Sequence, residues 1–138
     1  MRRFTTVLTV LLGLFPISFG LQFLLDPHGA ASGFGIDPWP TGTAAGYLAV
    51  KGIRDLVYGL IILVLFALGE RRATGIMMAL ASLIAFTDAI VVLTHDGPVA
   101  MALGVHALTG VVVLVDAFLL LRTRANAATQ ATPVGVHS

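Results

Sequence analysis

The sequence has no cysteine and few charged residues, and each shortage excludes a class of protein. Without cysteine the chain forms no disulfide, carries out no thiol redox chemistry and builds no thiolate metal site. Charged residues make up only 11% of the 138 residues, whereas hydrophobic residues make up 57%. An ordinary soluble domain carries about 25% charged residues, so this composition predicts a single small membrane domain.

The sequence motifs of soluble enzymes are also missing. The chain contains no G-x-S-x-G, Walker loop, dinucleotide fingerprint or H-E-x-x-H. Nothing indicates a nucleic-acid partner, because membrane topology and anionic lipid headgroups explain the arginines. Asp88 and His106 are potential metal ligands, but two ligands without a third argue against a metal site. We therefore expect neither a metal nor another cofactor.

Four apolar stretches, each long enough to cross a bilayer, organise the chain. A spanning helix needs about 20 apolar residues, and the stretches lie at about 4–25, 43–68, 73–94 and 99–121. They predict an all-α integral membrane four-helix bundle over residues 1–124. A cleaved signal peptide is the alternative for the first stretch, which is too long for one. Residues 125–138 are poor in large apolar side chains and predict a disordered cytoplasmic tail.

The connector between the first two stretches, residues 26–42, is rich in glycine, proline and aspartate. Phe34, Ile36 and Trp39 are interspersed among these residues, which suits a segment that lies in the headgroup region with aromatic anchors. We favour an interfacial connector. The functional alternative is a lid over a cavity.

The positions of the basic residues predict the orientation of the chain. Two of the eight lysines and arginines lie inside the second stretch, and the other six flank one side of the predicted bundle: Arg2, Arg3, Arg71, Arg72, Arg122 and Arg124. The segments on the other side contain aspartates and no basic residue. By the positive-inside rule both termini are cytoplasmic, and we expect a multi-pass protein of the bacterial inner membrane.

Three charged residues inside the second stretch need partners. Lys51, Arg54 and Asp55 each cost about 3 kcal/mol near the middle of a spanning helix, and roughly 9 kcal/mol together. The thirteen Leu, Ile, Val and Phe residues from Leu48 to Leu68 return only about 6 kcal/mol. The other spans must therefore supply partners for these charges.

Ionisable residues of three stretches lie at similar depths. At about 1.5 Å per residue from the outward ends, Lys51 is about 12 Å deep, Asp55 about 18 Å, Asp88 about 9 Å and His106 about 12 Å. We therefore predict a shared polar cavity in the outer half of the bundle. The candidate acid–base residues are Asp55, Asp88 and His106. The candidate ligand-binding residues are Lys51, Arg54, Tyr47, Tyr58, Ser18 and Gln22.

A purely structural interpretation competes with this one. Lys51 and Arg54 would neutralise Asp55 and Asp88, and the balanced set would only clamp the helices together. The free-energy cost of burying the charges favours a functional role, because two neutral polar residues would join helices at a lower cost than four desolvated charges. If these groups are packed solid against one another, the enzyme hypothesis fails.

Asp116 lies near the cytoplasmic end of the fourth stretch, away from this cluster. It is expected to pair locally with Arg122 or with Thr5 and Thr9 of the first stretch. We interpret it as structural, and a role in a proton path is the alternative.

The run from Lys51 to Asp55, with Gly33-Phe34-Gly35 before it and Thr87-Asp88-Ala89 after it, resembles a family of small four-span membrane proteins. That family is catalogued only as a domain of unknown function, and its shared core is G-[IL]-R-D in the second span. More distantly, the four-helix plan is similar to DoxX-like membrane proteins. The resemblance implies a four-helix membrane bundle and no activity.

Three functions fit these observations. The first is an enzyme that acts on an apolar or lipid-like ligand from the membrane by isomerisation, cyclisation or epoxide opening. Asp55 or Asp88 would be the base. The second is a proton-coupled carrier that acts as a homo-oligomer. The third is an accessory subunit of a membrane complex, in which the charges dock a partner span.

Overall fold

The computed structural model describes residues 2–130, with side chains up to residue 122, and every regular element in this part is a helix. The all-α prediction is therefore confirmed. The elements in chain order are α1 (Arg2–Leu25), α2 (Pro27–Ser32), η1 (Gly42–Ala45), α3 (Gly46–Ala67), α4 (Arg71–Thr94), α5 (Val99–Met101), η2 (Ala102–Ala107) and α6 (Leu108–Gln130).

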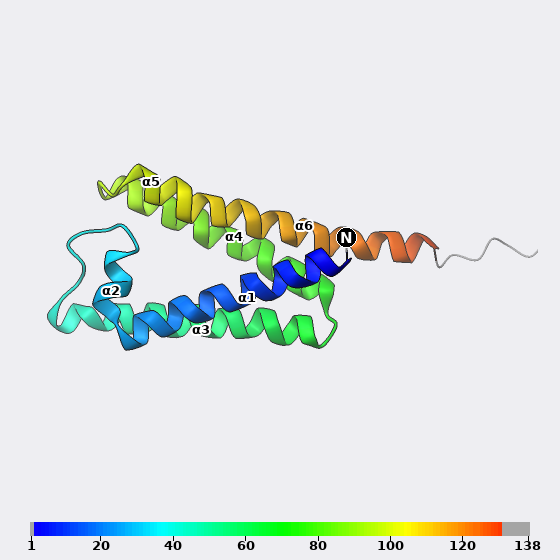
Figure 1. Cartoon of the computed structure of the whole chain (residues 1–138), viewed down its shortest axis with the longest axis horizontal. Coiled ribbons are helices and arrows are strands. Elements are labelled where there is room, and N and C mark those ends of the chain that lie inside the picture. Colours follow the sequence, from blue (N-terminus) through cyan, green and yellow to red (C-terminus); the bar gives the residue numbers. More distant parts are fainter. Residues whose placement is uncertain (1, 131–138) are drawn as a thin grey trace, which may run out of the picture.

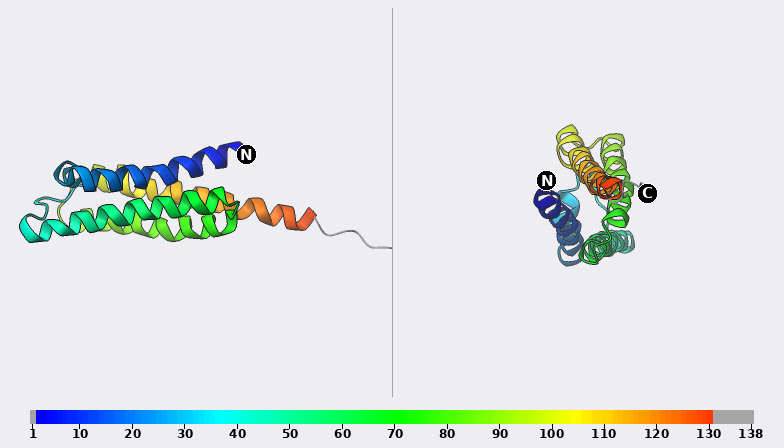
Figure 2. Two further views of the ribbon diagram at one scale, coloured as in Figure 1. Left: turned by 90° about the horizontal axis from the view of Figure 1, so that it is seen from below. Right: turned by 90° about the vertical axis from the view of Figure 1, so that its right-hand side faces the viewer.

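The long helices form two antiparallel pairs (Figures 1 and 2). α1 packs along α3, and α4 packs along the continuous helix made of α5, η2 and α6. The pairs meet where α1 begins and α3 turns into α4, which we call the narrow end. They spread apart at the opposite, wide end, where α2 and the following segment lie between them (Figure 1). This wedge shape determines where a cavity can form.

Close backbone contact holds α1 against α3. A Cβ atom added to Gly20 would lie 2.5 Å from the carbonyl oxygen of Gly52, and one added to Gly52 would lie 2.9 Å from that of Gly20. Such approach is possible only without side chains, as at other small-residue contacts between membrane helices. The glycines therefore explain why this pair is tight along its length.

A buried hydrogen bond joins the pairs at the narrow end. The Asp116 side chain is fully buried, and its Oδ2 accepts a hydrogen bond of 2.7 Å from Thr9 Oγ1. Nearby, Arg71 donates to Thr6 Oγ1 at 3.3 Å. The predicted pairing of Asp116 with a threonine of the first span is thus confirmed, and it ties α1 to α6.

Three helices are long and apolar enough to cross a membrane, and they indicate a membrane protein: Arg2–Leu25, Arg71–Thr94 and Val99–Arg122. α3 has a comparable length but is not among them, because it carries Lys51, Arg54 and Asp55.

Two helix bounds differ from the sequence prediction. α6 continues to Gln130, past the start of the predicted tail at Ala125, since alanine-rich sequence favours a helix. The rest of that tail, residues 131–138, lies outside the described residues. The predicted irregular connector contains the short helix α2, because Asp26 caps its start by accepting a 3.0 Å hydrogen bond from the backbone N–H of Gly29.

Candidate functional site

A cavity of about 730 Å³ lies between the two helix pairs. This volume falls within the range of about 300–1,000 Å³ that is typical of small-molecule sites. Its walls come from α1, α3, α4, η2 and α6, and most of them are apolar. Residues of the apolar wall include Leu12, Phe15, Phe19, Ile61, Ile62, Met78 and Val113.

All five ionisable residues of the predicted cluster line this cavity: Lys51, Arg54, Asp55, Asp88 and His106. The helices therefore bring the groups around a shared cavity and do not pack them solid against one another. Tyr58, also predicted, lines the cavity too, and its hydroxyl donates to the carbonyl oxygen of Met77 at 3.5 Å.

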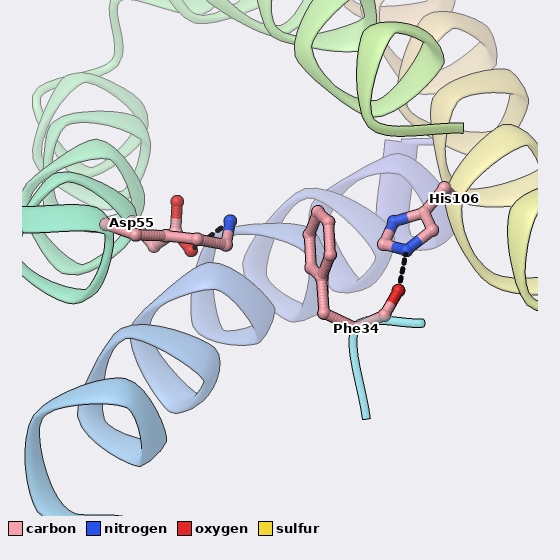
Figure 3. A network of polar contacts seen from close by, with 4 residues as sticks. Phe34, Asp55 and His106 are labelled. Carbon is pink, nitrogen blue, oxygen red and sulfur yellow. Dashed lines mark hydrogen bonds and ion pairs between the residues drawn. The ribbon is translucent and has the colours of Figure 1, made fainter. Parts of the chain in front are cut away.

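Lys51 and Asp55 form an ion pair across one turn of α3. Lys51 Nζ lies 3.1 Å from Asp55 Oδ2, and the two side chains are 25% and 24% exposed (Figure 3). The same ammonium group lies 4.9 Å from the ring centroid of Phe34 and 5.3 Å from that of Phe23. Both rings present π-electrons to the cation, which adds to the ion pair. Lys51 is therefore already engaged within the protein.

His106 is fixed by the connector through Phe34. The imidazole is 7% exposed, and its Nε2 donates to the carbonyl oxygen of Phe34 at 2.9 Å (Figure 3). The two rings also stack obliquely, with centroids 4.6 Å apart. Because a carbonyl only accepts, Nε2 carries a proton, and Nδ1 is an acceptor whenever the ring is neutral. His106 is thus oriented with one nitrogen engaged and the other available.

The helix around His106 is irregular. η2 is a π-helical segment inserted between α5 and α6. Such segments add a residue to a turn, re-aim the side chains near them and occur often at functional sites.

Asp88 and Arg54 are ionisable residues whose side chains have no bonded partner in the described part of the chain. The Asp88 side chain is partly buried and lines the cavity. Within residues 2–122, neither Asp88 nor Arg54 makes a hydrogen bond or ion pair. The hypothetical clamp of two ion pairs is therefore only half present, since Lys51 and Asp55 form its single pair.

Three predicted ligand-binding residues lie away from the cavity. Tyr47 is 74% exposed in the first turn of α3, and Ser18 and Gln22 are exposed on α1. Ser18 instead donates to the carbonyl oxygen of Phe15 at 2.7 Å. Ser18 and Gln22 each lie two residues from Gly20, which places them about 200° around the helix from the buried face. Their predicted placement in the cavity was wrong for this reason.

The sequence prediction missed Phe34 as a site residue. Phe34 lines the cavity and packs against the buried clusters of both helix pairs. Its ring lies between Lys51 and His106, so it closes the wide end of the cavity. The available signal was an aromatic residue between Gly33 and Gly35 in the connector. The alternative of a lid over a cavity was the interpretation closest to the observed position of Phe34.

The described residues hold no group of three His, Asp or Glu side chains that is arranged for a metal ion. Asp88 and His106 Nδ1 can accept protons, and Lys51, Arg54 and Tyr58 can donate hydrogen bonds.

Comparison of the chain with curated proteins and with solved structures gave no match. A family model matches residues 13–120, which run from α1 to α6 and include all five ionisable residues of the cavity. The predicted resemblance to a family of unknown function is confirmed, while the distant similarity to DoxX-like proteins stays a prediction. The chain belongs to the family described as Domain of unknown function (DUF4267).

Proposed function

We propose that the chain is a four-span membrane protein that binds a small apolar or lipid-like ligand in its cavity and acts on it by acid–base chemistry. Packing supports α3 as the second span. α3 lies along α1, so both cross the same membrane if either does. The composition of α3 is no obstacle, because Lys51 and Asp55 are paired and all three of its charges line the cavity.

Positive charge at the narrow end supports cytoplasmic termini. Five of the six flanking arginines lie there: Arg2 and Arg3 begin α1, Arg71 and Arg72 begin α4, and Arg122 of α6 follows Leu121, which packs beside Gly75 near the start of α4. By the positive-inside rule this end faces the cytoplasm, and α2 and the connector face outward. The protein would then be a multi-pass protein of the inner membrane with its ionisable groups in the outer half.

The observation that carries the catalytic proposal is an unpaired carboxylate in an apolar cavity. Of the two candidate bases, Asp55 is neutralised by Lys51, whereas Asp88 makes no hydrogen bond or ion pair in the described part of the chain. A carboxylate that no other side chain engages can accept a proton from a ligand beside it. Asp88 would therefore remove a proton from the ligand.

His106 and Lys51 would complete the chemistry. His106 is held by Phe34 with its Nδ1 available, so Nδ1 would take the proton from Asp88 and pass it to the product. Lys51, which lines the same cavity as Asp88, would stabilise negative charge that develops on the ligand. These roles suit isomerisation, cyclisation or epoxide opening.

The cavity favours an enzyme over a carrier. A carrier needs access from both sides of the membrane, but the narrow end is filled by Ile62, Met78 and Leu120 and joined by Thr9 and Asp116. The same cavity gives an accessory subunit no obvious use for its unpaired carboxylate.

The test compares small molecules that copurify with three forms of the protein from bacterial membranes. The forms are the wild type, Asp88→Asn and the control Asp96→Asn, whose residue lies in the turn before α5 and does not line the cavity. Mass spectrometry of the extracts should find one compound enriched in Asp88→Asn, because the ligand binds but is not converted. Identical extracts from all three forms would contradict the acid–base proposal.

A further inference from the structure

We infer that the ligand is a single-chain amphiphile with an anionic headgroup, a carboxylate or a phosphate, which Arg54 binds at a lateral opening between α3 and α4. This inference rests on the proposed ligand cavity and names the class of molecule that fills it. Three observations carry it: the lack of a partner for Arg54, its position and the shape of the cavity.

Arg54 is the cation of the site that the protein leaves unused. Lys51 is bound to Asp55 and lies over two aromatic rings, whereas Arg54 has no hydrogen bond, ion pair or ring contact among residues 2–122. Asp88 does not compensate it, since the two side chains form no ion pair or hydrogen bond with each other. A guanidinium offers five N–H donors in a fork that matches a carboxylate or phosphate.

The depth of Arg54 makes this lack of a partner costly. It lies eight residues into α3, about 12 Å from the first residue of that helix. An unpaired cation at such depth in a membrane costs about 3 kcal/mol or more, and residues of this kind generally mark ligand or ion sites. A bound anion would remove that cost.

The opening lies beside Arg54. Four exposed apolar side chains line the cavity along this side, and they are Ile53, Val57 and Ile61 of α3 and Ile84 of α4. On the other side, among the lining residues of α1, η2 and α6, only Phe15 is exposed. The cavity therefore opens mainly between α3 and α4, where acyl chains would surround the protein.

The cavity beyond Arg54 suits one apolar chain. Its walls toward the narrow end include Leu12, Ile62 and Met78, and no further charged residue lines it there. At about 730 Å³ it has the size of a pocket for a drug-sized molecule and not for a two-chain lipid. The headgroup would sit at Arg54, with the adjacent part of the chain near Asp88 and His106.

The test measures binding to the full chain in detergent by native mass spectrometry. Oleate and oleyl phosphate carry the two candidate headgroups, and oleyl alcohol has the same chain without charge. We expect both anions to bind about tenfold more tightly than the alcohol. A hydrogen bond to a charged group contributes enough binding free energy for a difference of this size. The tighter of the two anions identifies the headgroup.

Matched variants assign this preference to Arg54. Arg54→Gln should remove the tenfold preference, Arg54→Lys should keep part of it, and Arg72→Gln, which lies outside the cavity, should keep it in full. Val57→Trp should slow association by narrowing the opening, whereas Val64→Trp on the same helix, which does not line the cavity, should not.

The outcomes separate this inference from the proposed function. Equal affinity of the wild type for oleyl alcohol and for both anions would overturn the anionic headgroup while leaving a ligand cavity. This comparison needs no variant, so it decides the question even if Arg54→Gln does not fold. Failure of all three molecules to bind would overturn both the inference and the proposed function.

Discussion

His106 and Phe34 are 72 residues apart in the sequence, yet the imidazole Nε2 donates a 2.9 Å hydrogen bond to the Phe34 carbonyl oxygen. The bond joins the π-helical segment η2 to the connector after α2. It thereby fixes the side chain that covers the wide end of the cavity and the histidine that lines it.

Removing this bond should loosen the connector. His106→Ala deletes the hydrogen bond and the ring contact, so backbone amides of residues 33–41 should exchange with deuterium faster in detergent-solubilised protein. One hydrogen bond contributes about 0.5–1.5 kcal/mol, which corresponds to a several-fold increase in exchange. His95→Ala, in the exposed turn after α4, is the control and should leave those amides unchanged. Equal exchange in both variants would show that the connector is held by other contacts.

Thr9→Val should destabilise the bundle. The substitution keeps the shape of the side chain but leaves the fully buried Asp116 without its 2.7 Å hydrogen bond. An unsatisfied buried polar group costs about 1–3 kcal/mol, so the melting temperature in detergent should fall by several degrees. Thr87→Val changes an exposed threonine of α4 in the same way and should have little effect. A Thr9→Val protein as stable as the Thr87→Val protein would contradict the assigned role of Asp116.

Gly52→Ala should force α1 and α3 apart. The new Cβ would lie 2.9 Å from the Gly20 carbonyl oxygen, closer than real side chains approach. Overpacking of this kind costs about 1–3 kcal/mol, which a thermal unfolding experiment detects. Gly46→Ala, at the start of the same helix, meets no atom within 4 Å and should be neutral or stabilising. If both variants unfold at the same temperature, the close contact is not what holds this pair together.

The proposed orientation can be tested directly because the chain has no cysteine. A single cysteine at Thr41 should react with a membrane-impermeant maleimide on intact spheroplasts, because this residue lies at the outward end. A single cysteine at Glu70, in the turn between α3 and α4, should react only after the membrane is permeabilised. The opposite pattern would reverse the topology, and reaction of both in intact spheroplasts would contradict four spans.

The sequence was sufficient to predict the helices and the shared level of the ionisable groups. Apolar length defines a membrane helix, and a rise of 1.5 Å per residue converts position into depth. The sequence was not sufficient to predict which neighbouring residue each side chain contacts. Tyr47, Ser18 and Gln22 lie at suitable depths, but rotation about the helix axis turns them away from the cavity.

The uneven packing of the helices could not be derived from periodicity. Two tight pairs separated by a wedge depend on local contacts such as Gly20 against Gly52. The role of Phe34 depends on the path of an irregular connector, which has no repeating pattern to interpret. The same packing leaves the side chains of Asp88 and Arg54 unpaired in the described part of the chain. The balanced number of charges in the sequence had instead suggested two ion pairs.

The central claim is that one ligand occupies the cavity between the helix pairs. The most direct measurement is native mass spectrometry of the protein released from the bacterial membranes in which it is made. Ala85 lines the cavity on α4, whereas Leu83 of the same helix is exposed and does not. We predict one bound small molecule in the wild type and in Leu83→Trp, and none in Ala85→Trp, whose indole fills the space. The same bound mass in all three proteins, or none in the wild type, would contradict the claim.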